Sequence, residues 1–346
     1  MRGLVIILIA ISILGCKKEG TDPNNCDNSP IQKIYPSKNL ANDSFSSGIY
    51  ILNEGTFTFG NASISYYDPQ TNQLIQSVFE AANGRKIGDV LQSATVDGGN
   101  IWLSVNNSQK VEKVDLKTLK AEIIYAGFGS PRHTCIGPEG QIIVTELYSQ
   151  GVRWVDTVSA CVTRHEQTGG WTEFIEKLNG SIYVMIRKTL NDNSTNEGVW
   201  VFGEGSSQFL STNGTPLAMT QSKGQIYLIV ESTDSIYQVQ TIQGQSVQVL
   251  GQLADSGIPS NLQPGFNNDL FFLQSGLWTY SNGTATKVFD KDGIWYGYAV
   301  DYARQEVYLF DAKDYVSRGM AYRLNASYTV VDSFETGVIP SKGIVF

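Results

Sequence analysis

The chain has 346 residues, of which 41% are hydrophobic and 17% charged, and its formal net charge is −8. This acidic balance argues against nucleic acid as the general partner. There are only two histidines, His133 and His165. Two histidines are too few for a histidine-rich metal site. We predict neither a bound metal nor a cofactor.

The first fifteen residues have the pattern of a secretory signal peptide. Arg2 precedes an apolar run from Leu4 to Leu14. At about eleven residues this run is too short to span a bilayer, which takes roughly 20. The run ends in Leu14-Gly15-Cys16, which resembles the lipobox of bacterial lipoproteins, so Cys16 is the predicted lipidation site. An ordinary signal peptide followed by a chance cysteine is the alternative.

Residues 16–46 are predicted to form a flexible tether, because they are rich in Asn, Asp, Ser and Pro and poor in groups that fill a core. The charged residues Lys17, Lys18 and Glu19 resemble the surface-export signal of Bacteroidetes lipoproteins. We therefore expect a lipid-anchored outer-membrane protein exposed at the cell surface. A merely solvated linker is the alternative reading of these charges.

A repeat with a mean spacing of about 43 residues fills residues 47–346. Short β-rich strings recur after a Gly or Asn turn, and their aliphatic positions are Ile49, Ile101, Ile142, Ile182, Ile226, Leu270 and Val307. A second series, which opens a further strand each time, is Ile64, Val111, Val152, Val199, Ile236, Leu277 and Met320. Repeats of this length with short strands are typical of propeller blades. We predict an all-β, seven-bladed β-propeller with four-stranded blades, and a pair of β-sandwiches is the alternative.

The innermost strands share a recurrent lead, which predicts how the ring closes. Examples are Ser130-Pro-Arg-His, Thr215-Pro-Leu-Ala and Ile258-Pro-Ser-Asn, and the chain ends with Ile339-Pro-Ser-Lys. The first blade lacks such a strand before Gly48. The C-terminal strand is therefore expected to complete the first blade, which removes an exposed sheet edge.

The cysteines give no disulfide framework, because three remain once Cys16 is lipidated. Cys135 and Cys161 are expected on an inner and an outer strand of one blade. Two strands would separate them, so we expect no bridge between them.

The two faces of the predicted propeller differ in their loops. The turns between first and second strands are short and rich in Gly and Asn, whereas the opposite loops carry aromatic and basic side chains. Such loops are typical of recognition surfaces. The candidate ligand-binding residues are Phe57, Phe59, Arg85, Lys86, Asn107, Phe128, Arg132, His133, Tyr148, Trp171, Arg187, Trp295 and Tyr296, with Lys188 adding to the basic charge. The alternative for each is packing against a neighbouring blade or plain solvation.

Signatures of catalysis are absent from the sequence: there is no nucleophile elbow, phosphate-binding loop or paired-cysteine zinc spacing. We therefore predict a binding protein and not an enzyme. A propeller hydrolase or lyase is the alternative, with Asp89, Glu146 and Glu231 as carboxylates that could converge in the central channel.

Two stretches carry a family resemblance, Asn53-Glu-Gly-Thr-Phe and Gly88-Asp-Val-Leu-Gln-Ser. They resemble the YncE/YVTN-like surface propeller lipoproteins of Bacteroidetes, and the repeat extends the likeness over all seven blades. The resemblance implies capture of a small solute, a cobalamin-like corrinoid being favoured, and its transfer to a TonB-dependent outer-membrane transporter. It implies membrane contact through the lipid anchor only and a monomer outside the transporter complex. A ferric siderophore, a glycan or a protein is the alternative ligand.

Overall fold

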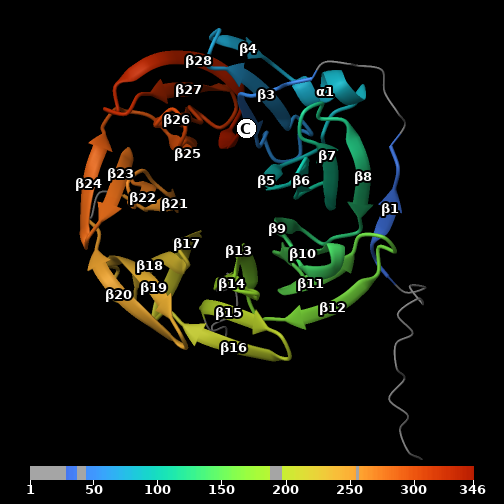
Figure 1. Ribbon diagram of the computed structural model, residues 1–346, viewed down its shortest axis with the longest axis vertical. Coiled ribbons are helices and arrows are strands. Elements are labelled where there is room, and N and C mark those ends of the chain that lie inside the picture. The colour runs from blue at the N-terminus through green and yellow to red at the C-terminus, as the bar shows by residue number, and fades with distance from the viewer. Residues whose placement is uncertain (1–28, 37–43, 188–196, 255–256) are drawn as a thin grey trace, which may run out of the picture.

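The computed structural model describes residues 29–36, 44–187, 197–254 and 257–346. The predicted signal peptide, Cys16 and Lys188 lie outside these residues. In the described chain the strands form seven four-stranded antiparallel units arranged in a ring (Figure 1). The predicted β-propeller fold is confirmed.

The blades follow one another in chain order, each written here from the inner to the outer strand. The first contains β29 (Pro340–Val345), β2 (Ile49–Asn53), β3 (Ser63–Asp68) and β4 (Gln73–Ile75). The second contains β5 (Leu91–Asp97), β6 (Asn100–Val105), β7 (Lys110–Asp115) and β8 (Ala121–Ala126). The third contains β9 (Pro131–Ile136), β10 (Gln141–Glu146), β11 (Gly151–Asp156) and β12 (Val162–Gln167). The fourth contains β13 (Trp171–Leu178), β14 (Ser181–Arg187), β15 (Gly198–Gly203) and β16 (Ser206–Ser211).

The remaining three blades have the same order. The fifth contains β17 (Gly214–Ser222), β18 (Gln225–Ser232), β19 (Tyr237–Gln243) and β20 (Ser246–Gln252). The sixth contains β21 (Ser260–Pro264), β22 (Leu270–Leu273), β23 (Leu277–Ser281) and β24 (Thr284–Phe289). The seventh contains β25 (Trp295–Asp301), β26 (Glu306–Asp311), β27 (Arg318–Leu324) and β28 (Val330–Val338). A short helix, α1 (Val78–Asn83), and a 3₁₀ turn, η1 (Pro138–Gly140), complete the described elements, and neither is long and apolar enough to cross a membrane.

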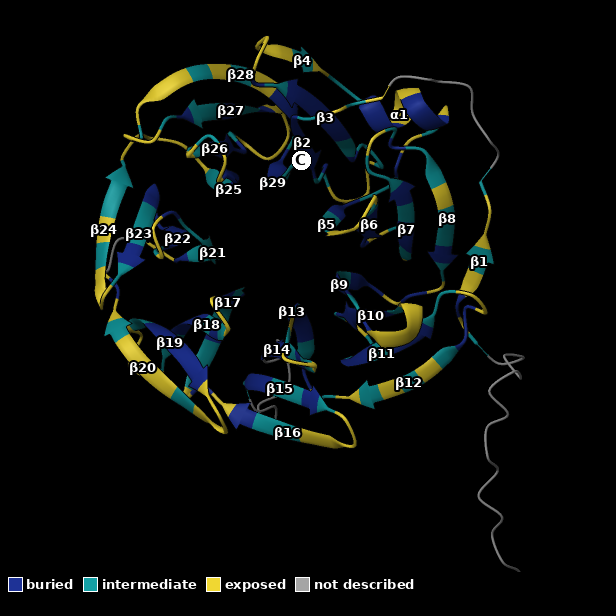
Figure 2. Ribbon diagram, in the orientation of Figure 1, coloured by how far each residue is buried: buried dark blue, intermediate teal, exposed yellow. Residues whose placement is uncertain are grey.

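The hydrophobic core lies between adjacent blades. The aliphatic series of the repeat occupies the second strand of every blade, and all its members are buried. One cluster joins Trp102 and Val111 of the second blade to Ile142 and Val144 of the third. The outer strands are the most exposed, as the yellow segments of β12, β16 and β20 show in Figure 2. Each blade therefore needs both neighbours to bury its apolar faces.

The C-terminal strand closes the ring as predicted. β29 pairs antiparallel with β2, for example Ile49 with Val345, and a single parallel bridge from Tyr298 to Lys342 joins the last blade to the first. The Phe346 ring stacks on Tyr50 with 4.5 Å between the ring centroids. The first blade is thus built from both ends of the propeller.

The predicted tether is wrong for residues 29–36, which pack on the propeller. β1 (Gln32–Ile34) pairs with β8 as a fifth strand of the second blade. Ile31 is buried in the core cluster between the second and third blades. The Nζ of Lys33 donates to the carbonyl oxygens of Thr157 and Val158 at 2.9 and 3.0 Å. Composition missed this segment because main-chain pairing at a sheet edge needs little hydrophobicity.

The structure describes Cys135 and Cys161. Cys135 is a buried free thiol on β9, so it does not pair with Cys161, as predicted. Cys161 is disulfide-bonded, a pairing that the sequence left open.

Candidate functional site

Two cavities are stacked along the axis of the ring, between the inner strands. The mouth cavity, of about 280 Å³, opens on the side of the long loops and is lined by Glu54, Gln92, Arg132, His133, Glu173, Phe174, Arg187, Ser260, Asn261, Trp295, Tyr296, Ser341 and Lys342. The turn-side cavity, of about 420 Å³, lies nearer the short Gly/Asn turns and is lined by Ala94, Thr95, His133–Cys135, Phe174–Lys177, Met219, Thr220, Asn261–Gln263, Lys342 and Gly343.

Four side chains, those of His133, Phe174, Asn261 and Lys342, line both cavities and form the layer between them. Three of the four occupy one position of the repeat. His133, Asn261 and Lys342 each stand two residues after the proline that leads into an inner strand. Side chains alternate along a strand, so this shared position places all three on the channel side.

The mouth cavity combines paired and unpaired charges. The Nε of Arg132 donates to the Glu173 carboxylate at 2.9 Å. The Tyr296 hydroxyl hydrogen-bonds to Glu54, and burial raises the pKa of the Glu54 carboxyl. The Arg187 side chain forms no hydrogen bond or ion pair with any residue that the structure describes. Its guanidinium is therefore a free donor group at the edge of this cavity.

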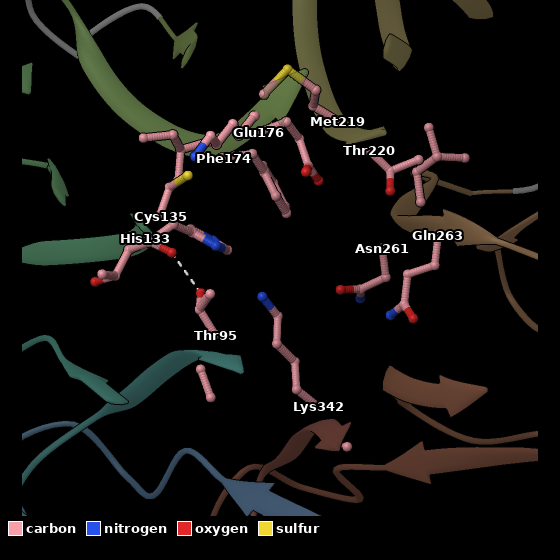
Figure 3. Close-up of a pocket in the computed structure, with 16 residues that line it drawn as sticks. Thr95, His133, Cys135, Phe174, Glu176, Met219, Thr220, Asn261, Gln263 and Lys342 are labelled. Atoms are coloured by element: carbon pink, nitrogen blue, oxygen red, sulfur yellow. Dashed lines mark hydrogen bonds between the residues drawn. The ribbon is translucent and has the colours of Figure 1, made fainter. Parts of the chain in front are cut away.

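The turn-side cavity holds Lys342 at its centre, with the side chains of Glu176, Thr220 and Asn261 facing it from other blades (Figure 3). In the described part of the chain, the Lys342 ammonium has no hydrogen bond or ion pair. Its Nζ lies 5.8 Å from the centroid of the Phe174 ring, within the range of a cation–π contact. Phe174 in turn packs against the His133 ring at 4.7 Å between centroids.

The ionisable groups of this cavity have perturbed pKa values. Burial lowers the pKa of Lys342 to about 8, although the nearby Glu176 carboxylate opposes the shift. Burial raises the pKa of Glu176 to about 7. Burial, together with the charges of Lys342 and Arg132, holds the pKa of His133 well below its usual range. Near neutral pH, Lys342 is therefore mostly a cation, His133 is neutral and Glu176 is only partly ionised.

Five of the candidate residues line the mouth cavity: Arg132, His133, Arg187, Trp295 and Tyr296. Another group lies exposed on the loops around it. Phe57, Phe59 and Tyr148 are 58%, 71% and 69% exposed. Lys86 and Asn107 are also exposed, and the Asn107 amide donates to Asp89.

The other three candidates line neither cavity and contact other parts of the protein. Phe128 is 1% exposed and belongs to the core between the second and third blades, so it cannot reach a surface ligand. Arg85 pairs with the buried Glu112 and lies over the Phe79 ring at 5.2 Å. Trp171 pairs with Arg187 across β13 and β14 and lines neither cavity.

The proposed convergence of Asp89, Glu146 and Glu231 in the channel is wrong, because none of them lines either cavity. Asp89 accepts hydrogen bonds from Thr58 and Asn107 in the loops. Glu146 is fully buried beside Arg153, at 2.7 Å between charged atoms. Glu231 pairs with Tyr237 within the fifth blade.

Sequence reasoning missed the carboxylates Glu54, Glu173 and Glu176 and the ammonium of Lys342, which line the channel. The signal for Lys342 was present in the shared proline lead, which aligns it with His133 and Asn261. Groups of three or more His, Cys, Asp or Glu that could hold a metal ion do not occur in the described ranges.

Solved structures similar to this chain are β-propellers of diverse activity. A quinonprotein alcohol dehydrogenase-like protein from Bacteroides thetaiotaomicron is 16% identical, with a TM-score of 0.64 over 88% of this chain and 79% of that one. The periplasmic gluconolactonase of Pseudomonas aeruginosa is 13% identical, with a TM-score of 0.61 over 86% of this chain and 99% of that one. An inactive virginiamycin B lyase from Staphylococcus aureus is 15% identical, with a TM-score of 0.56 over 81% of this chain and 94% of that one. At these identities the likeness shows the fold alone.

Sequence comparison gives the family. No curated protein sequence matches the chain. Residues 47–258, well over half of the chain, match the family described as a domain of unknown function, DUF5074. This β-propeller chain belongs to the DUF5074 family.

Proposed function

We propose that this protein is a lipid-anchored binding protein of the cell surface, which captures a small solute at the mouth cavity and passes it to a TonB-dependent outer-membrane transporter. The observation that carries the proposal is the free guanidinium of Arg187, which lines one cavity together with Arg132, Trp295 and Tyr296. Fixed cationic donors beside flat aromatic rings suit an anionic or amide-bearing ligand.

The size of the mouth cavity limits how much of a ligand can enter it. Its volume of about 280 Å³ is below the usual range for a drug-sized ligand, roughly 300–1,000 Å³. A corrinoid would therefore insert a polar arm and lay its macrocycle over the exposed rim near Phe57 and Phe59. The loop that carries these rings is tied to the mouth, because Thr56 bonds to the Tyr315 carbonyl and Tyr315 packs against Tyr296.

The direct test is calorimetric titration of the propeller with cobalamin and with a ferric catecholate siderophore. We expect one of them to bind, and Arg187→Met to weaken it at least about tenfold, because a charge-assisted hydrogen bond is lost. Arg318→Met is the matched control, since this exposed arginine lies outside both channel cavities. Binding that is unchanged in Arg187→Met, or no binding of either compound, contradicts the assignment.

The lipid anchor is supported by the apolar run from Leu4 to Leu14 and the Leu14-Gly15-Cys16 sequence that follows it. Cys16→Ser should release the protein from the membrane fraction, as cell fractionation would show. A variant that stays with the membranes contradicts the anchor. Transfer to a transporter predicts that the lipidated chain co-purifies with a TonB-dependent outer-membrane protein, and its repeated absence from the purified material would contradict the transfer step.

An enzymatic role is the second candidate, and one observation favours it. Glu176 and Lys342 face the same cavity and have pKa values of about 7 and about 8, so both exchange protons near neutral pH. A hydrolase or lyase would lose turnover in Glu176→Gln. Assays of the wild-type protein on lactones, glycosides and phosphoesters test this role, and no turnover on any of them favours the binding protein.

A further inference from the structure

We propose that the turn-side cavity is a second binding site, next to the mouth and sharing Lys342 with it, for a small hydroxylated carboxylate of the size of a monosaccharide acid, with the Lys342 ammonium as its anchor. This inference goes beyond the function proposed for the mouth cavity and does not depend on it.

Lys342 differs from the buried charges elsewhere in the molecule. Glu112 pairs with Arg85 and Lys110, and Glu306 pairs with Arg323 at 2.8 Å. Lys342, at the centre of the ring, has no such partner among the described residues. An ammonium removed from bulk water without a counter-ion is costly, so its position favours an anionic ligand.

A set of polar groups lies opposite Lys342. The Thr220 hydroxyl, from the fifth blade, makes no hydrogen bond within the described chain. The Asn261 amide nitrogen donates to the Tyr296 carbonyl at 2.8 Å, which leaves its oxygen available, and Gln263 lies two residues further along β21. These groups come from rigid strands of separate blades, and their side chains point into the cavity (Figure 3). They suit ligand hydroxyls, which donate and accept.

The cavity also has an apolar wall. The Phe174 ring lines it and can cover the C–H face of a sugar ring. Glu176 completes the lining, and its raised pKa of about 7 lets a protonated fraction donate to the ligand instead of repelling it. A volume of about 420 Å³ accommodates a monosaccharide but not a polymer.

The experiment is calorimetric titration at pH 6.5 with D-galacturonate, D-glucuronate and D-gluconate, against the neutral D-galactose, D-glucose and sorbitol. We expect at least one acid to bind and its neutral counterpart to bind at least about tenfold more weakly, because the carboxylate–ammonium contact is lost. Lys342→Met should reduce affinity for the acid by a similar factor. Lys223→Met is the control for net charge, since this exposed lysine lies on a neighbouring turn outside the cavity.

Two further variants locate the ligand. Thr220 lines only the turn-side cavity, and Thr220→Val, which keeps the side-chain shape, should weaken binding of the acid several-fold. Arg187 lines only the mouth cavity, so Arg187→Met should leave the affinity for the acid unchanged. If none of the acids binds, or if Lys342→Met binds as well as Lys223→Met, the second site is overturned. If Arg187→Met weakens the acid and Thr220→Val does not, the acid occupies the mouth: the second site fails and the proposed function stands.

Discussion

Charged side chains differ in their pairing inside the blades and in the channel. Within the third blade, the fully buried Glu146 pairs with Arg153 at 2.7 Å and accepts a hydrogen bond from the Gly129 amide. In the channel, the side chains of Lys342 and Arg187 form no hydrogen bond or ion pair with the residues described. Paired charges fix how strands sit against each other, whereas unpaired ones remain available to a ligand. The difference marks the channel as the place to look for function.

Removing residues 341–346 should have the largest effect, because β29 both closes the ring and carries Lys342. Without it, β2 loses its inner neighbour and the buried side chains of Tyr50 and Ile51 lose cover. We expect the loss to exceed the whole stability of a typical domain, about 5–15 kcal/mol. Circular dichroism should show no cooperative unfolding, and a truncated chain that melts like the full one would refute the closure.

Breaking a buried ion pair within a blade should lower the free energy of unfolding by less than this, but still severely. Arg153→Met leaves the Glu146 carboxylate buried without its cation. We expect the free energy of unfolding to fall by about 3–5 kcal/mol, as measured by urea denaturation. Arg318→Met, which removes an exposed arginine 3.5 Å from Glu335, should change stability by less than about 1 kcal/mol. Equal losses in the two variants would contradict the contrast between buried and exposed pairs.

The fold was predictable from the sequence because every blade buries the same positions. Ile101, Ile142 and Ile226 recur at the spacing of one blade and all lie in second strands. The closing strand was predictable because Pro340 begins it, as a proline begins or precedes other inner strands. Residues 29–36 were not predictable, because they are held mainly by main-chain pairing and by one apolar residue, Ile31, which composition does not reveal.

The site was only partly predictable. The search for aromatic and basic loop residues selected Arg187, Trp295 and Tyr296, which line the mouth cavity. The same reasoning selected Phe128, which is a core residue, because a loop position alone does not show burial. Glu176 was missed, because convergence of side chains from separate blades depends on the ring and not on local sequence.

The pH dependence of the free energy of unfolding should show the lowered pKa of Lys342. Burial lowers its pKa from 10.5 to about 8. Between these values the unfolded chain binds more protons than the folded one, so stability rises with pH. Among the groups that face Lys342, Glu176 has a pKa of about 7 and the pKa of His133 lies well below its usual range, so neither changes this sign above pH 8.

The wild type should therefore gain about 1–2 kcal/mol relative to Lys342→Met between pH 8 and pH 10. Parallel urea denaturation of the two proteins across this range measures the difference. A difference that stays constant with pH would show that Lys342 titrates in the folded protein as it does in water.

The exposed aromatic rim should affect stability least. Phe59→Ser removes a ring that is 71% exposed, so we expect a change of less than about 0.5 kcal/mol in the free energy of unfolding. Affinity for a ligand at the mouth should still fall if the ring covers it. A large loss of stability in this variant would show that the loop rings serve packing and not binding.

The contrast between paired buried charges and the unpaired charges of the channel is tested most directly by the stability of Lys342→Met at pH 7, measured by urea denaturation. An ammonium without a partner contributes nothing to folding, and its replacement by an apolar side chain of similar length removes a desolvation cost. We predict a free energy of unfolding equal to that of the wild type or about 1–2 kcal/mol higher. A loss of more than about 1 kcal/mol would contradict the account, because Lys342 would then support the fold and would not be held free for a ligand.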